Sequence, residues 1–178
     1  MPGYKRGVKR FEKKDYLGAI EDFNFEIRKK PNNAAALRYR GDAKRILGDY
    51  AGSLKDLDES LRLEPDDAFA LRARGEAKRM LEDYAGSLKD FDESLRLKPD
   101  GAFALIGRGK TKQQLKELPS ALNDFSEALK NCEASLSLAP NDLDNLINRG
   151  IAKRLLGDYL GALKCELRAE LYKMPIHR

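Results

Sequence analysis

The sequence has little of what catalysis, metal binding or phosphate binding requires. Its one histidine, His177, is the penultimate residue of 178, in a tail that we expect to be frayed. A histidine general base in a folded site and a His–Cys metal cluster are therefore not expected. No G-x-x-x-x-G-K-[ST] motif occurs, so a phosphate-binding loop has no support. The sequence predicts a non-enzymatic protein with no catalytic residue, no metal and no cofactor.

Long apolar runs and cysteine pairs are also missing. No run approaches the roughly 18 apolar residues that a membrane-spanning helix needs, and the basic start MPGYKRGVKRFEKK has no apolar signal-peptide core. The two cysteines, Cys132 and Cys165, form no C-x-x-C motif and are too few for a disulfide framework. We expect a soluble cytoplasmic protein with two free thiols and no membrane partner.

Repetition is what the sequence has in abundance. Arg-Gly pairs recur at steps of 34, 34, 34 and 41 residues, beginning at Arg6-Gly7 and ending at Arg149-Gly150. Asp-Tyr pairs and prolines mark the same period. The chain is therefore expected to be a single domain of five units, which are residues 1–31 (partial), 32–65, 66–99, 100–140 and 141–178.

Each unit contains the pattern of two helices. In the second unit, apolar or small residues recur at helical spacing over residues 34–47 and again over residues 50–63. Gly48 supplies a stop and Asp49 an N-cap between them, and Pro65 blocks continuation. Strands have no support, because β-branched and alternating stretches are almost absent. We expect ten helices.

A 34-residue helix–turn–helix unit of this kind resembles the tetratricopeptide repeat family, and the resemblance spans nearly the whole chain. The residues that carry it in the second unit are Leu37, Gly41, Ala43, Gly48, Tyr50, Leu54, Leu57 and Pro65. The resemblance implies an all-α, right-handed superhelical solenoid of about five repeats. It also implies a protein-interaction scaffold that binds a peptide or helical segment in a concave groove lined by the first helix of each repeat, helix A.

One unit is longer than the others. The step from Gly109 to Gly150 holds seven extra residues, which fall in the stretch LKNCEASLSLAP. Seven residues are about two helical turns, so the insertion nearly preserves the apolar face. We expect a lengthened second helix, helix B, over residues 120–138. It either extends the convex surface, which we favour, or adds a second contact site.

A column of arginines precedes the glycines, and an aspartate follows 16 residues later in four of the five units. A half-buried arginine needs a carboxylate, and its planar fork suits bidentate pairing. The sequence therefore predicts a structural Arg–Asp lattice. Its expected members are Arg6 with Asp22, Arg40 with Asp56, Arg74 with Asp90 and Arg108 with Asp124, and the fifth unit has Cys165 opposite Arg149.

The second and third units show which positions vary. Residues 34–65 and 68–99 differ at seven of 32 places, and four of these lie on one face of helix A. The four are Ala35/Phe69, Tyr39/Ala73, Asp42/Glu76 and Ile46/Met80. In the tetratricopeptide repeat family this face lines the groove, so a diversified groove is favoured. Drift at exposed sites is the alternative.

The same face carries charges at one-turn spacing. In the ladders Arg38-Asp42-Arg45 and Arg72-Glu76-Arg79, each acid is placed to reach an arginine on either side. Two arginines for one carboxylate leave surplus positive charge, and aromatic rings flank it. The predicted peptide-binding groove consists of Arg38, Tyr39, Asp42, Arg45, Phe69, Arg72, Glu76, Arg79, Phe103, Lys110 and Arg154. It suits a protein or peptide carrying Asp or Glu beside an apolar anchor.

Two other partner classes are disfavoured. The net charge of +5 suggests an alternative function, nucleic-acid binding by a basic module. However, the excess positive charge lies in the first and last units and forms no continuous stripe. Some tetratricopeptide domains hold the acidic tails of heat-shock chaperones with a clamp of lysine, arginine and asparagine. The matching places in units two to four are Arg38, Asp42, Ala73, Phe103 and Gly107, which do not make that clamp.

The fifth unit is expected to expose Leu163, Leu167 and Leu171 on its second helix. Self-association through this unit is the favoured explanation. A piece of a longer array and a small tolerated patch are the alternatives. A purely structural or designed array is argued against by the insertion, by Pro119 and by the degenerate first unit.

Overall fold

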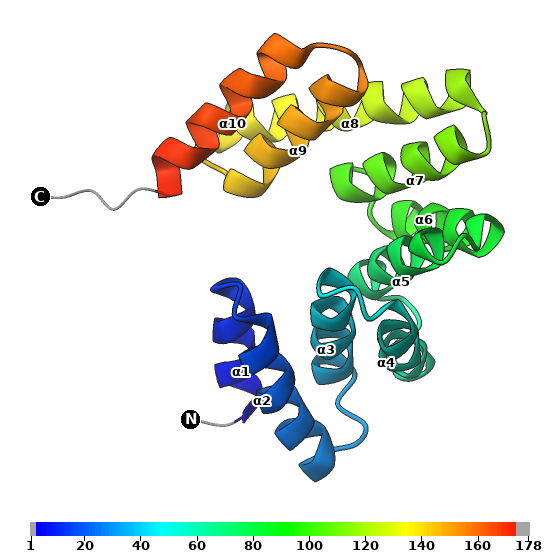
Figure 1. Ribbon diagram of the computed structural model, residues 1–178, viewed down its shortest axis with the longest axis vertical. Coiled ribbons are helices and arrows are strands. Elements are labelled where there is room, and N and C mark those ends of the chain that lie inside the picture. The colour runs from blue at the N-terminus through cyan, green and yellow to red at the C-terminus, as the bar shows by residue number, and fades with distance from the viewer. Residues whose placement is uncertain (1–2, 174–178) are drawn as a thin grey trace, which may run out of the picture. The chain divides into compact units, whose positions relative to one another are not determined.

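The computed structural model describes residues 3–173, and over that range it contains ten α-helices and no strand (Figure 1). The helices are α1 (Gly3–Glu12), α2 (Tyr16–Lys29), α3 (Ala34–Ile46), α4 (Tyr50–Leu63), α5 (Ala68–Met80), α6 (Tyr84–Leu97), α7 (Ala102–Gln114), α8 (Leu118–Leu138), α9 (Leu143–Leu155) and α10 (Tyr159–Lys173). The prediction of an all-α fold built from helix–turn–helix pairs is confirmed. His177 lies outside the described residues.

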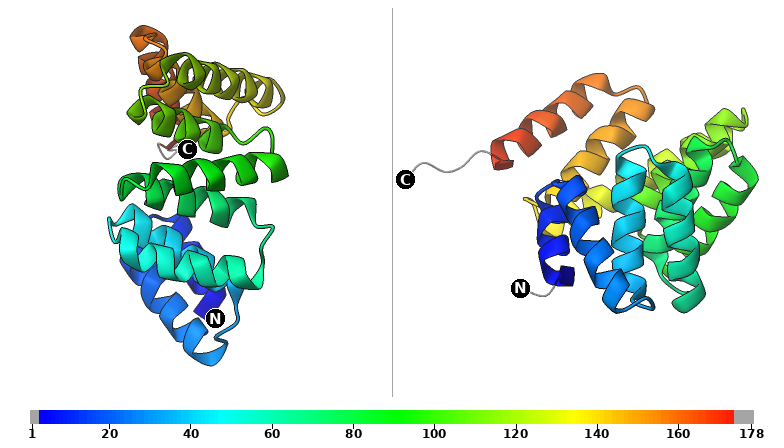
Figure 2. Two further views of the ribbon diagram at one scale, coloured as in Figure 1. Left: turned by 90° about the vertical axis from the view of Figure 1, so that its right-hand side faces the viewer. Right: turned by 60° about the horizontal axis from the view of Figure 1, so that its bottom comes forward.

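The chain divides into two compact units, Met1–Leu97 with α1–α6 and Lys98–Arg178 with α7–α10. In each unit the two helices of a repeat lie antiparallel (Figure 2). Helix B of one repeat also contacts helix A of the next, as α2 contacts α3, α4 contacts α5 and α8 contacts α9. Within each unit, a repeat therefore buries its apolar face against its neighbour as well as within itself.

Short polar signals set the helix ends. The Asp49 carboxylate accepts a hydrogen bond from the Gly52 N–H at 2.9 Å, and the Asn33 side chain accepts one from the Ala36 N–H at 3.0 Å. Gly48 ends the preceding helix in the left-handed region, with φ of 88°. These N-caps and the glycine stop satisfy groups that the helix termini leave without partners.

Small residues on helix A allow the two helices of a repeat to approach closely. A Cβ placed on Gly41 would lie 2.8 Å from Leu57 Cγ, too close without a shift of that side chain. The Ser60 hydroxyl donates to the Ala34 carbonyl at 2.9 Å, and the Ser94 hydroxyl donates to the Ala68 carbonyl at 2.8 Å. These two serines thus join helix B to helix A of the same repeat.

The predicted Arg–Asp lattice is present. Arg74 donates from Nε to Asp90 Oδ2 at 2.8 Å and from Nη2 to Asp90 Oδ1 at 2.7 Å, and Lys78 is 2.9 Å from the same carboxylate. Asp90 is 2% exposed, so these cations supply the partners that its buried charge needs. The same pairing joins Arg6 to Asp22, Arg40 to Asp56 and Arg108 to Asp124.

The lattice also joins neighbouring repeats. Arg40 Nη1 donates to Asn24 Oδ1 at 2.8 Å, and Arg74 Nη1 donates to Asp58 Oδ1 at 2.9 Å. In both cases the acceptor lies on helix B of the preceding repeat. One guanidinium therefore connects its own repeat to the one before it.

The insertion forms part of α8, a single helix of 21 residues that begins two residues before the expected start. Its last turns do more than extend the surface. Leu136 is 7% exposed and packs with Leu146 of α9 and Ala169 of α10. The added length therefore supplies core for the fifth repeat.

Candidate partner-binding surface

The predicted groove residues fall into both compact units. Eight of them lie on α3 and α5, the A helices of the second and third repeats, which contact each other. Phe103 and Lys110 lie on α7 and Arg154 lies on α9, in the second unit. Within the second unit, Arg154 forms an ion pair with Glu166 of α10.

The charged side chains on α3 and α5 form one cluster, which we call the arginine cluster. It consists of Arg38, Arg45, Arg72 and Arg79 with Asp42, Asp67 and Glu76. Arg45 Nε donates to Asp42 Oδ1 at 2.8 Å, and Arg79 Nε donates to Glu76 Oε2 at 3.0 Å. These two contacts match the one-turn spacing of the sequence.

Arg38 departs from the predicted ladder. Its Nη1 lies 3.4 Å from Asp67 Oδ2, 29 residues further along, instead of pairing with Asp42. Asp67 is the N-cap of α5 and accepts hydrogen bonds from the Phe69 and Ala70 N–H groups. The ladder prediction was wrong at Arg38 because the cap of the next helix brings a carboxylate within reach. The only signal for the contact between Arg38 and Asp67 in the sequence is the presence of an aspartate just before a helix.

Arg72 is an arginine of the cluster whose charge is partly desolvated. Its side chain is 20% exposed, and its Nη2 lies 3.9 Å from Asp42 Oδ2. Burial lowers the pKa of Arg72 below its ordinary value, Asp42 and Glu76 oppose that shift, and Arg45 and Arg38 add to it. Four arginines and three carboxylates thus gather in a partly desolvated place.

The rings beside the cluster have different roles. Phe69 is 52% exposed, and the Arg38 guanidinium carbon lies 5.5 Å from its ring centroid. Tyr39 instead stacks on Phe23, with centroids 5.6 Å apart, and its ring contacts Tyr4 and Phe11 edge-on. Tyr39 is thus part of the core of the first two repeats, while Phe69 offers an apolar surface to solvent.

One of the four variable positions also has a packing role. Ala73, which is equivalent to Tyr39, is 1% exposed and packs against Leu57 and Leu61 of α4. This position faces the preceding repeat, so its change accompanies a change of core. By contrast Phe69 and Met80 are exposed.

Neither a membrane span nor a metal site is indicated in the described part of the chain. None of its helices combines the length and the apolar character that crossing a membrane requires. Residues 3–173 also contain no group of three or more His, Cys, Asp or Glu side chains placed to hold a metal ion.

No family model and no curated protein matches this chain. Among solved structures it is similar to MamA from Desulfovibrio magneticus, at 17% identity and a TM-score of 0.63 over 96% of this chain and 93% of that one.

Two further solved structures are similar. YrrB, described as a TPR protein with an unusual peptide-binding site, has 16% identity and a TM-score of 0.62 over 99% of this chain and 87% of that one. The first TPR of Spaghetti (RPAP3), bound to an HSP90 peptide, has 24% identity and a TM-score of 0.61 over 64% of this chain and 90% of that one. At these identities the likeness shows the fold.

Proposed function

We propose that this chain, which has the fold of tetratricopeptide repeat proteins, is a non-enzymatic scaffold that binds an acidic segment of a partner protein. The binding surface would be the arginine cluster of α3 and α5 together with Phe69. One observation carries the proposal: four arginines gather with carboxylates beside an exposed aromatic ring. Guanidinium forks beside an apolar surface suit a carboxylate next to an apolar anchor.

The electrostatics of Arg72 support a carboxylate as the ligand. Burial and two neighbouring arginines lower the pKa of Arg72, and Asp42 and Glu76 oppose that shift. A partner carboxylate near this guanidinium would act in the same direction as Asp42 and Glu76. The exposed ion pairs around it contribute only about 0–1 kcal/mol each. Specificity would therefore come from the apolar anchor on Phe69, and the charges would mainly speed association.

The remaining predicted groove residues lie in the second unit, and the proposal keeps them as partner contacts of that unit. Phe103 is 44% exposed on α7, Lys110 is half-buried on the same helix, and Arg154 is exposed on α9. A chaperone-tail clamp is still not proposed, although one similar structure holds an HSP90 peptide. Ala73 is a core residue here and Asp42 is acidic, so neither offers the cations that such a clamp needs.

A continuous basic track for nucleic acid is likewise not part of the proposal. The arginines of the cluster are interleaved with carboxylates, whereas a phosphate-tracking surface needs an unbroken cationic stripe. The two thiols, Cys132 and Cys165, are free and buried. They support a reducing compartment such as the cytoplasm as the place of action.

The test is a peptide array in which each peptide carries Asp or Glu near a single Phe or Leu, with matched peptides bearing Asn or Gln instead. We expect the intact chain to retain the acidic peptides. Arg72→Gln should weaken binding by about tenfold or more, because a charge-assisted contact is lost. Phe69→Ala should also weaken binding.

Arg62→Gln is the matched control, because it removes the same charge from an exposed side chain of α4 outside the cluster. If Arg62→Gln and Arg72→Gln weaken peptide binding equally, net charge alone controls binding. Equal retention of acidic and neutral peptides would rule out an acidic ligand. Helical circular dichroism should be the same for all variants.

A further inference from the structure

Between repeats, small residues of helix A pack on apolar residues of helix B. In α5, Ala73 and Ala77 are buried, at 1% and 0% exposure. Ala73 contacts Leu57 and Leu61 of α4, which are also buried. This apolar contact is the stacking surface that holds one repeat against the next.

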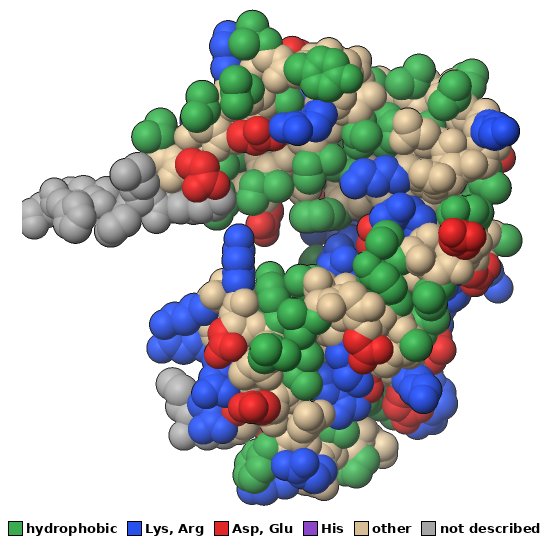
Figure 3. Space-filling model, in the orientation of Figure 1, with side chains coloured by type: hydrophobic (Ala, Val, Ile, Leu, Met, Phe, Trp, Pro, Cys, Tyr) green, Lys and Arg blue, Asp and Glu red, His purple; other side chains and the backbone are tan. Residues whose placement is uncertain are grey.

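The outer face of α1 has the opposite character. At the positions equivalent to Ala73 and Ala77, 68 residues earlier, α1 carries Lys5 and Lys9, and both are exposed. Lys and Arg side chains are prominent over the α1–α2 end in Figure 3. A face built for internal stacking is thus replaced by a basic one.

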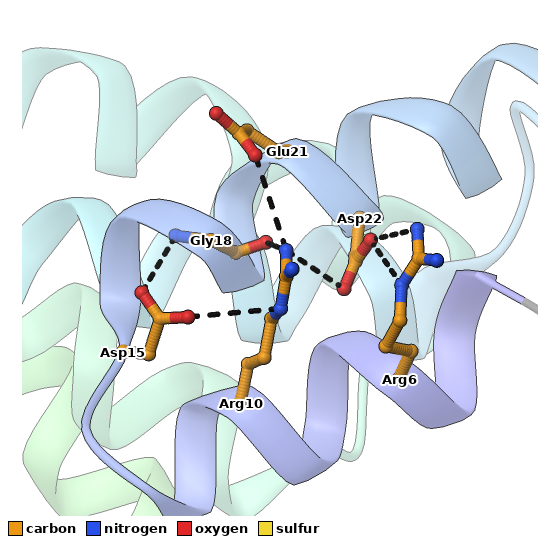
Figure 4. Close-up of polar contacts among 6 residues, drawn as sticks. All are labelled: Arg6, Arg10, Asp15, Gly18, Glu21 and Asp22. Carbon is orange, nitrogen blue, oxygen red and sulfur yellow. Dashed lines mark hydrogen bonds and ion pairs between the residues drawn. The ribbon is translucent and has the colours of Figure 1, made fainter.

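Arg6 adds a directed contact to this face. Arg40 and Arg74 each use Nη1 to reach helix B of the preceding repeat. Arg6 donates to Asp22 through Nε and Nη2 (Figure 4), and its Nη1 has no partner among the described residues. It is half-exposed at the rim of a concavity of about 370 Å³ that Arg10, Phe25 and Glu21 also line.

The outer face of α10 has the complementary character. Where α4 has Leu57 and Leu61, α10 has Glu166 and Glu170, 109 residues later, and both are exposed. Arg154 contacts Glu166 and orients its carboxylate. Leu163 and Leu167 lie beside them, at 49% and 59% exposure, and apolar side chains form a row along α10 in Figure 3.

We propose that these two faces bind each other between copies of this chain. Glu166, Leu167 and Glu170 of one copy dock on the α1–α2 end of a second copy, opposite Lys5, Lys9 and Arg6. The carboxylates meet cations, and Leu167 meets the exposed ring of Phe25. Inside the chain, the equivalent positions stack one repeat on the next. Because these positions carry opposite charges on the α1 and α10 faces, a second copy of the chain fits both faces.

The proposed contact is head-to-tail. Pairing two α10 faces would place Glu166 and Glu170 of both copies together, and pairing two α1 faces would bring lysines together, which like-charge repulsion disfavours. A heterologous contact uses different surfaces on the two partners, so it grows into rings or open chains instead of stopping at a dimer. Its strength should fall as salt is added.

Charge reversal with complementation tests the proposal on the full chain. Lys5→Glu/Lys9→Glu makes the α1 face acidic, and Glu166→Lys/Glu170→Lys makes the α10 face basic. Light scattering at increasing protein concentration should show salt-sensitive self-association of the unaltered chain. Each variant alone should associate at least about tenfold more weakly, because like charges then face each other. An equal mixture of the two variants should associate again, because each altered face then meets an opposite charge.

Glu170→Lys alone leaves the contact between Arg154 and Glu166 in place. It replaces the double variant Glu166→Lys/Glu170→Lys in the test if that variant loses helicity. A monomeric unaltered chain at its highest soluble concentration overturns the proposal, and so does a mixture that fails to recover association. Association that ignores charge reversal but is lost in Leu160→Ser/Leu171→Ser would also overturn it, in favour of paired leucine rows. None of these variants changes the arginine cluster, so the peptide test stands separately.

Discussion

Arg149 donates from Nε to the Cys165 sulfur at 3.1 Å, at the place where the other four repeats set an arginine against an aspartate. Cys165 is 2% exposed, and a thiol is a weak acceptor. The fifth repeat therefore keeps the cation of the lattice without its carboxylate.

We expect Cys165→Asp to stabilise the second compact unit by about 1–3 kcal/mol, the range for hydrogen bonds to charged groups. Arg149 is already half-buried, so the new carboxylate meets a cation that is largely desolvated. Urea unfolding followed by circular dichroism measures the change. Cys165→Asn, which has a similar size without the charge, should give less. A destabilised Cys165→Asp would show that the fifth repeat does not tolerate the lattice.

Cys132 is the second buried thiol, and its burial has a consequence for reactivity. Burial raises its pKa from 9.0 to about 11, against an opposing effect of Arg149. Since the thiolate is the reactive form, Cys132 should react with iodoacetamide much more slowly in the native chain than in the urea-unfolded chain. The Cys165→Asp variant leaves Cys132 as the only thiol and isolates the measurement. Equal rates in the two states would contradict the burial of Cys132.

The same shift sets a dependence of stability on pH. The unfolded chain loses the Cys132 proton near pH 9, while the folded chain keeps it until about pH 11. The contribution of this thiol to stability is therefore complete below pH 9 and falls as the pH rises through that window. In the Cys165→Asp background, Cys132→Ala should flatten the fall in stability over that range.

The lattice aspartates should be much more important for stability than their exposed neighbours. Asp90 is 2% exposed and holds both Arg74 and Lys78, so Asp90→Asn leaves two cations around a neutral amide. We expect a loss of about 3–5 kcal/mol, as for other broken buried pairs. Asp58→Asn removes an exposed acceptor from the same Arg74 and should cost about 0–1 kcal/mol. Similar losses in the two variants, measured by urea unfolding, would refute a structural role for the buried carboxylate.

Sequence reasoning reached the helices and the lattice because both depend on local or periodic signals. The start of α4 follows from the cap at Asp49 and its end from Pro65, which prevents continuation. The pairing of Arg74 with Asp90 follows from a spacing of 16 residues that is repeated in other units.

Contacts between repeats could not be obtained in the same way. Arg38 reaches Asp67 across 29 residues, and Tyr39 turns into the core on Phe23. Both depend on how one helix A lies against a neighbouring repeat, and a helical wheel of a single helix does not contain that angle. Which helix A residues are free to touch a partner depends on the same packing.

The inserted turns of α8 offer the sharpest test of how the second unit is held together. Leu136 is 7% exposed and packs with Leu146, which is 0% exposed, and with Ala169. Leu138 lies two residues further along the same helix and is 89% exposed. Because these two leucines share a helix and nearly the same place in it, each controls for the other's effect on helix propensity.

We expect Leu136→Ala to destabilise the second unit by about 2–5 kcal/mol, since it removes buried methyl groups and leaves a cavity. Leu138→Ala should change stability by less than about 0.5 kcal/mol, as at other exposed sites. Hydrogen exchange of α9 and α10 amides, read by mass spectrometry, should rise in the first variant and stay unchanged in the second. Exchange in α1–α6 should not change in either. If Leu136→Ala leaves α9 and α10 as protected as before, the inserted turns do not support the fifth repeat.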